Sequence, residues 1–168
     1  LSLGGPSTSK VERAAIRYAV ARGALVVTAA GNDSAMGNPV EYPAALVQPV
    51  GSNGSQSKGL VVGASGEGTR AEFSGTGSWI SLAAPGVKVY GALGRGRYGY
   101  GSGTSFATAE ISGAAALVWA ANPSLSAQHV ARILEETASG HGAWTSALGF
   151  GVVDVAAAVA RAQTLAAK

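Results

Sequence analysis

Ala24-Leu25-Val26-Val27-Thr28-Ala29 is the stretch that decides the fold class of this chain. The run is mostly apolar and β-branched, too short for a helix of its own and too apolar for a strand with one face in water. It therefore predicts a strand buried in a parallel sheet. Directly before it, Ser7-Thr8-Ser9 can cap a helix that ends near Gly23. A helix that leads into a buried parallel strand indicates an α/β fold with helices flanking the sheet.

Further strands are expected along the chain. Leu60-Val61-Val62-Gly63-Ala64 repeats the signature of a buried strand, and Trp79 to Ala83 predicts another that ends at the turn Pro85-Gly86. The glycine-rich stretches 31–59 and 91–103 are interpreted as long connections, which often carry binding residues. Within the second stretch, a hairpin that leads to Ser105 is the simplest account of residues 94–100.

Three more helices are expected. Small apolar residues from Thr104 to about Ala121 predict a helix buried on nearly every face. An amphipathic helix follows the cap Ser126, and a last helix runs from Val155 to about Leu165.

Length and composition exclude several classes of function. The chain has 168 residues, 47% of them hydrophobic, which is enough for one domain with a sizeable core. Its net charge is only +3 and the basic residues are scattered, so nucleic acid is not an expected partner. Without cysteine there is no disulfide, zinc–thiolate site or cysteine nucleophile. No apolar run reaches the roughly 18 residues of a membrane span.

The most informative segment is Gly101-Ser102-Gly103-Thr104-Ser105-Phe106-Ala107-Thr108-Ala109. Glycines lead into the helix, and Ser105 lies in its first turn, where backbone N–H groups and the helix dipole favour developing negative charge. This placement suits a nucleophile. The alternative is that Ser105 only caps the helix, because serine is a common N-cap residue.

Several segments together resemble the subtilisin-like serine peptidases. The nucleophile motif of that family, Gly-Thr-Ser-Met-Ala-x-Pro, is similar to residues 103–109, with Ala109 in place of the proline. The other similar segments follow in the family's order: Leu1-Ser2-Leu3-Gly4-Gly5, Ala29-Ala30-Gly31-Asn32, Tyr42-Pro43-Ala44, Phe73-Ser74, Ala84-Pro85-Gly86 and Gly149-Phe150-Gly151-Val152-Val153-Asp154.

The resemblance implies that residues 1–168 are the C-terminal half of a subtilisin-like catalytic domain, an α/β fold that lacks the N-terminal part of its sheet. It implies a serine endopeptidase that forms an acyl-enzyme on Ser105, with Asn32 as an oxyanion donor. Asn32 could instead be a simple turn former. The competing function is an inactive fragment that binds peptides or only folds. The family's aspartate and histidine would precede Leu1, so that the N-terminal half of the domain is an expected partner.

Neither histidine of the chain is expected to replace the missing base. His129 falls in the helix after Ser126 and His141 in the flexible sequence Gly140-His141-Gly142. No cofactor or metal is expected, although calcium is possible in the parent enzyme. The loop 65–69 lacks the aspartate often found at a weaker calcium site of the family. The resemblance also implies a secreted protein.

The expected substrate is a peptide or protein chain that binds as an extended strand. The resemblance assigns its contacts to a short set of residues: Ser2, Leu3, Gly4, Gly5, Ala29, Ala30, Gly31 and Glu41. Glu41 would lie at the base of the pocket for the residue before the scissile bond and would favour lysine or arginine there. The alternative is a displaced loop in which Glu41 is solvated.

Without the first half of the domain, strand 24–29 would have an open edge, which predicts self-association of the isolated chain.

Overall fold

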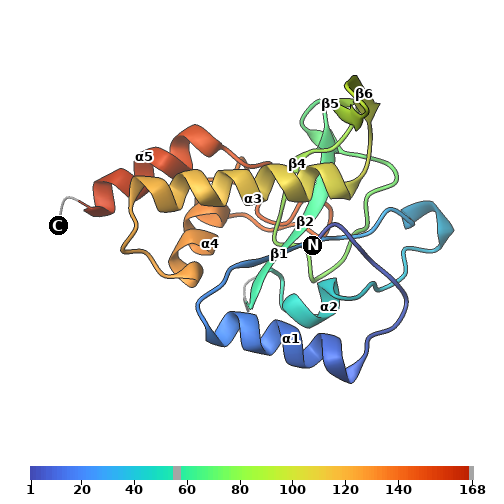
Figure 1. Cartoon of the computed structure of the whole chain (residues 1–168), viewed down its shortest axis with the longest axis horizontal. Helices are drawn as coiled ribbons and strands as arrows, with labels where there is room; N and C mark the ends of the chain where they lie inside the picture. The colour runs from blue at the N-terminus through green and yellow to red at the C-terminus, as the bar shows by residue number, and fades with distance from the viewer. Residues whose placement is uncertain (55–57, 167–168) are drawn as a thin grey trace.

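A short parallel sheet organises the chain in the computed structural model, which describes residues 1–54 and 58–166. Strand β2 (Gly59–Gly66) lies in the middle and pairs in parallel with β1 (Val26–Ala29) and with β4 (Leu82–Pro85). The two-residue strand β3 (Thr69–Arg70) folds back against the end of β2. The predicted α/β fold with a parallel sheet is confirmed (Figure 1).

Helices cover both faces of this sheet because successive strand residues point to opposite sides. Val27 and Leu60 belong to a core shared with α3 (Thr104–Ala121), α4 (Ala127–Glu136) and α5 (Val155–Ala166). Val26 and Val61 belong to a second core shared with α1 (Lys10–Ala21) and α2 (Ala44–Val47). In Figure 1, β2 crosses α3 in the view, and α1 and α2 lie below these elements.

Three helix caps, at Ser9, Ser126 and Asp154, are present. The Ser9 side chain accepts a hydrogen bond from the Glu12 N–H at 3.0 Å, and the Ser126 side chain accepts one from the His129 N–H at 3.3 Å. Asp154 likewise accepts from the Ala157 N–H at 2.8 Å where α5 begins.

One expectation about the chain between β2 and α3 is wrong. The apolar residues Trp79 and Ile80 precede the strand instead of forming it, since the Ile80 N–H donates to Gly77 in a turn and both side chains fill the second core.

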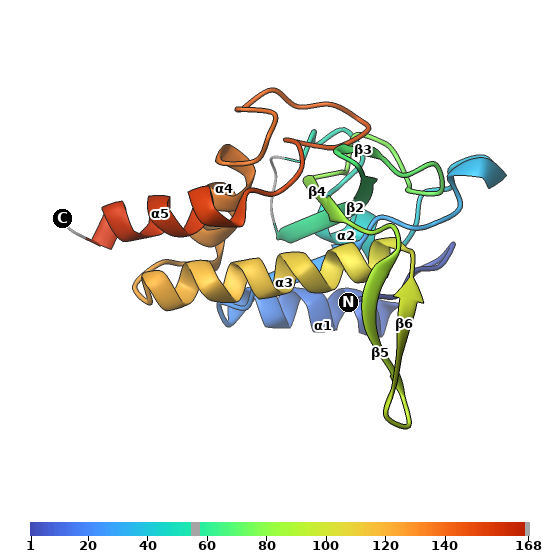
Figure 2. The ribbon, with the colours of Figure 1, turned by 90° about the horizontal axis from the view of Figure 1, so that it is seen from above.

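The hairpin expected before Ser105 is confirmed. It consists of β5 (Val89–Gly94) and β6 (Arg97–Gly101) and extends away from the body of the domain (Figure 2).

Helix α3 is buried on one face only, which corrects the expectation of burial nearly all round. Ile111 and Val118 are fully buried, whereas Leu117 is 54% exposed and Ala116 is exposed as well. No described residue covers this outer face, which is mostly apolar but includes the exposed Glu110 and Ser112.

Strand β1 lies at the edge of the sheet. On its open side, the backbone hydrogen bonds to described residues are both to Leu1: the Leu1 N–H donates to the Val27 carbonyl, and the Ala29 N–H donates to the Leu1 carbonyl at 3.2 Å. In the described parts of the chain, no strand continues this pairing. None of the described helices has the length and hydropathy needed to cross a membrane.

A buried acid in α4 makes stability depend on pH. The Glu135 side chain is only 9% exposed, and Oε1 has no hydrogen-bond partner among the described residues. Burial raises the pKa of Glu135 to about 8 and Glu136 adds to the increase, while Arg132 opposes it. The folded state therefore binds a proton that the unfolded state, with a pKa near 4.5, releases.

We expect the free energy of unfolding to fall as pH rises from 4.5 towards 8, by about 3 kcal/mol at pH 7. Glu135→Gln should remove most of this dependence and stabilise the chain at pH 7 while changing little at pH 4. Urea unfolding at pH 4, 6 and 8 measures the effect, with Glu72→Gln as the matched control, because Glu72 is exposed and does not contribute to the pKa shift of Glu135. Equal pH profiles for wild type and Glu135→Gln would contradict the assignment.

Candidate active site

Ser105 is the second residue of α3 and is half-buried. The N-cap of the helix is Gly103, at φ 157°, and no side chain caps the helix. The alternative that Ser105 serves as the cap is therefore wrong. The Gly103 N–H donates to the Gly86 carbonyl at 2.8 Å, which anchors the approach to the helix. No described residue forms a hydrogen bond to the Ser105 hydroxyl.

Asn32 follows β1 and is tied to the residue before the serine. Its Oδ1 accepts hydrogen bonds from the backbone N–H of Thr104 at 2.9 Å and from the Thr104 hydroxyl at 3.1 Å. Thr104 lies 72 positions after Asn32 in the sequence, so these hydrogen bonds of the Asn32 side chain do not stabilise a local turn. Because Oδ1 is fixed, the Nδ2 group is directed away from Thr104, and no described acceptor takes its protons.

Ser105 and Asn32 line one cavity of about 210 Å³. Most of the expected substrate-binding residues share it, together with two residues that the sequence did not single out, Asp33 and Thr104. The full lining is Ser2, Leu3, Gly4, Ala29, Gly31, Asn32, Asp33, Glu41, Thr104 and Ser105.

Two expected residues do not reach this cavity wall. Ala30 is 1% exposed and packs in the second core, where its N–H donates to Val62 at 3.0 Å. Gly5 exchanges two backbone hydrogen bonds with Tyr42, at 3.0 and 2.9 Å. Gly5 thus fixes the end of the segment without facing the cavity.

The segment before Gly5 presents free backbone to the cavity. Leu1 is bonded to β1 at one end, and the Ser2 hydroxyl donates to the Ser105 carbonyl at 3.1 Å. Between these anchors and Gly5, the backbones of Leu3 and Gly4 form no hydrogen bond to any described residue. An extended peptide can pair with such an unpaired edge.

Glu41 projects into the same cavity. Its carboxylate lies between Gly4 and Gly31, so close that a methyl group on either Cα would collide with it. The residue is 9% exposed, and the alternative of a displaced, solvated Glu41 is therefore wrong. Burial raises the pKa of Glu41 and the Asp33 carboxylate raises it further, while the Asn32 backbone N–H opposes both.

Neither histidine contributes to this cavity. His129 lies on α4 with Nδ1 3.2 Å from the Ser126 hydroxyl, and His141 lies in the loop after α4. Among the described residues there is no group of three or more His, Asp or Glu side chains that could hold a metal ion. Residues 66–69 form the turn between β2 and β3.

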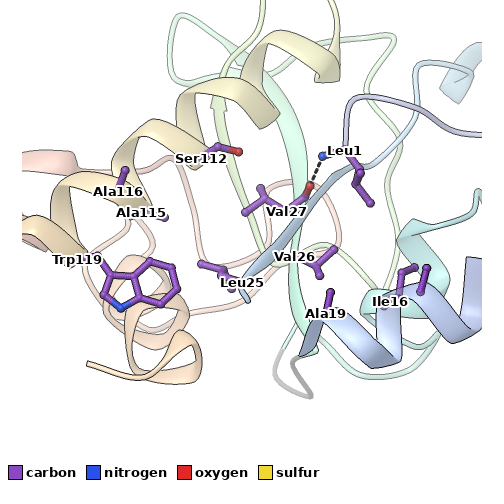
Figure 3. Close-up of a pocket in the computed structure, with 11 residues that line it drawn as sticks. Leu1, Ile16, Ala19, Leu25, Val26, Val27, Ser112, Ala115, Ala116 and Trp119 are labelled. Carbon is purple, nitrogen blue, oxygen red and sulfur yellow. Dashed lines mark hydrogen bonds between the residues drawn. The ribbon is translucent and has the colours of Figure 1, made fainter. Parts of the chain in front are cut away.

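A second, apolar cavity of about 520 Å³ follows the open edge of β1 (Figure 3). Leu25, Val26 and Val27 form its floor, with Ile16 and Ala19 of α1 on one side and Ala116 and Trp119 of α3 on the other. We call this cavity the edge groove. It contains no acid or base and is distinct from the cavity at Ser105.

Known proteins resemble the chain over nearly its whole length. A model of the subtilase family matches residues 1–151. Subtilisin BL of Lederbergia lenta is 38% identical over 159 residues, which cover 94% of this chain and 54% of that protein. A subtilisin of Bacillus pumilus is 35% identical over 164 residues, with the same coverage. The chain thus spans about half the length of these relatives.

Solved structures agree with the sequence comparison. A protease of Pseudoalteromonas arctica has a TM-score of 0.76 and 34% identity, covering 96% of this chain and 50% of that one. The self-cleaved protease domain of PatA has a TM-score of 0.78 and 26% identity, covering 98% and 61%. Since the family model spans all but the last 17 residues (168 less 151) and the fold agrees, the chain belongs to the subtilase family.

Proposed function

We propose that this chain is the nucleophile-bearing half of a serine endopeptidase that cleaves peptides or proteins. One observation carries the proposal: Thr104 holds Asn32 with its amide donors free, at the rim of the cavity that Ser105 lines. Nucleophile and oxyanion donors around one cavity are what acyl transfer requires.

In the proposed reaction the Ser105 oxygen attacks the peptide carbonyl carbon while a base takes the hydroxyl proton. The resulting oxyanion accepts hydrogen bonds from the Ser105 N–H and from Asn32 Nδ2. The protonated base gives its proton to the leaving amine as the peptide C–N bond breaks. Water then hydrolyses the acyl-enzyme by the same steps and restores the serine.

We assign the base and its orienting aspartate to the half of the domain that this chain does not contain. The cavity lining includes no histidine, and the chain spans about half of its relatives. Calcium, where the parent enzyme binds it, is assigned to that same half.

Covalent labelling tests the proposal. The chain, joined or mixed with the segment that its own gene encodes upstream, should react with a fluorophosphonate at Ser105. Ser105→Ala should abolish the labelling. Ser102→Ala, at an exposed serine three positions earlier, should retain it. Failure of the wild-type assembly to label would favour the alternative, an inactive peptide-binding or folding fragment.

The edge groove is the proposed docking surface for that other half. It joins the edge of β1, which Leu1 pairs at two backbone hydrogen bonds and no described strand covers, to the exposed face of α3, a combination that attracts another chain. The isolated chain should therefore self-associate at micromolar concentration through the same surface.

Two matched variants of α3 test this docking prediction. Ala116→Glu places a charge inside the edge groove, whereas Ala120→Glu places it on an exposed position outside the lining. We expect Ala116→Glu to weaken both self-association and assembly by about tenfold or more, because it buries an unpaired charge. Ala120→Glu should leave both unchanged. Sedimentation analysis measures self-association, and a wild-type chain that is a monodisperse monomer at micromolar concentration would contradict the prediction.

We further propose that the parent enzyme is secreted, with no nucleic acid or membrane as partner. Family membership supports this localisation. Immunoblotting of culture medium against cell lysate tests it.

A further inference from the structure

We propose that Glu41 selects substrates with lysine or arginine immediately before the scissile bond. The inference rests on the proposed function, because it names the side chain that the cavity beside Ser105 receives.

The position of the cavity determines which substrate residue enters it. Ser105 and Asn32 line it together, so the carbonyl that is attacked must lie at their side of the cavity. The side chain on the Cα next to that carbonyl is the one within reach of the remaining volume. Gly4 and Gly31 form the walls there without side chains of their own, and the Glu41 carboxylate lies between them.

The charge in this cavity lacks a cationic partner. Glu41 is 91% buried (100 less 9% exposed), and the described residues include no lysine or arginine in the lining. The second carboxylate of the lining, Asp33, adds to the negative charge. Among the described residues, the Asn32 backbone N–H is the group that stabilises the Glu41 carboxylate by a hydrogen bond.

This electrostatic arrangement discriminates three classes of side chain. A lysine or arginine forms a charge-assisted hydrogen bond to Glu41 and compensates a buried charge. A leucine removes water from the carboxylate without replacing the hydrogen bonds that it loses. A glutamate adds a like charge and is rejected.

The test compares Glu41→Gln with the control Glu72→Gln, which makes the same change of charge at an exposed position. In the assembled enzyme, kcat/KM is measured for two chromogenic tetrapeptides that differ only in arginine or leucine before the leaving group. We expect the wild type to prefer arginine by about 10- to 150-fold, the range of a hydrogen bond to a charged group. Glu41→Gln should abolish most of that preference, and Glu72→Gln should retain it.

Binding provides a readout that needs no catalysis. Product-like peptides that end in arginine or leucine with a free C-terminal carboxylate are titrated against the assembled Ser105→Ala protein. The titration is repeated with the Ser105→Ala, Glu41→Gln double variant. Suppose that the arginine peptide binds more tightly and that this depends on Glu41, but that the wild-type assembly fails to label at Ser105. This result would support the inference while the proposed function fails. Labelling at Ser105 with an arginine preference that survives Glu41→Gln, or with no preference at all, would overturn the inference alone. Binding of neither peptide would overturn it as well.

Discussion

Ser105→Ala is expected to lower kcat of the assembled protease by about 10⁶, a magnitude taken from subtilisin, a member of the same family. Among the described residues the Ser105 hydroxyl has no hydrogen-bond partner, and in the proposed reaction it is the group that attacks the peptide carbonyl. Its loss leaves binding and oxyanion stabilisation, which still accelerate hydrolysis by about 10³–10⁴ over water. KM should change little, because alanine leaves the cavity walls in place.

Single-turnover and steady-state hydrolysis of a chromogenic peptide measure this effect. Ser102→Ala is the control, because the Ser102 hydroxyl only accepts from the Lys88 N–H at 2.9 Å. Residual activity of Ser105→Ala above about a thousandth of wild type would show that another group is the nucleophile.

The isolated chain gives a second view of the same serine. It should show no robust turnover without the other half, because no base lies within hydrogen-bond reach of Ser105 among the described residues. Robust turnover by the chain alone, abolished by Ser105→Ala, would show that His129 or His141 moves into the site.

Asn32→Leu is the second large effect, with an expected loss of about 10²–10³ in kcat, or roughly 2.7–4 kcal/mol of transition-state stabilisation, again a magnitude known from subtilisin. Leucine is close in size to asparagine but has no N–H to donate to the oxyanion. KM should stay nearly constant, because the interaction forms in the transition state.

Two companion variants separate donation from positioning. Asn32→Asp retains an oxygen for the two hydrogen bonds from Thr104 but loses the donor, so its loss should approach that of Asn32→Leu. Thr104→Val removes only the hydroxyl contact and should cost about tenfold or less. An Asn32→Leu variant that raises KM at constant kcat would assign Asn32 to substrate binding instead.

The sequence predicted the fold where one physical signal dominates. The run that contains Val26 and Val27 is buried on both sides, so only a parallel strand under helices satisfies it. The strand near residue 80 was misplaced because Trp79 and Ile80 are equally apolar in a turn, and only the sheet register identifies Leu82 as its start. The buried surface of α3 was overestimated, because the composition of a helix does not show which of its faces packs against a neighbouring element.

The site shows the same division. Ser105 and Asn32 could be identified from their motifs, and the structure brings both to one cavity. The two hydrogen bonds from Thr104 could not be predicted, since they join segments far apart in sequence, although Thr104 directly precedes the serine. Asp33 was missed for a similar reason, because its effect on Glu41 depends on how the loop folds back.

The link between Asn32 and Thr104 has a consequence for the life of the chain before it is folded. The Asn32 amide acquires its direction only after β1 and α3 have docked, because its partner Thr104 lies 72 residues further along the chain. If Asn32 is the oxyanion donor as proposed, an unfolded or partly folded copy lacks that donor. The oxyanion stabilisation therefore forms together with the tertiary fold and not before it.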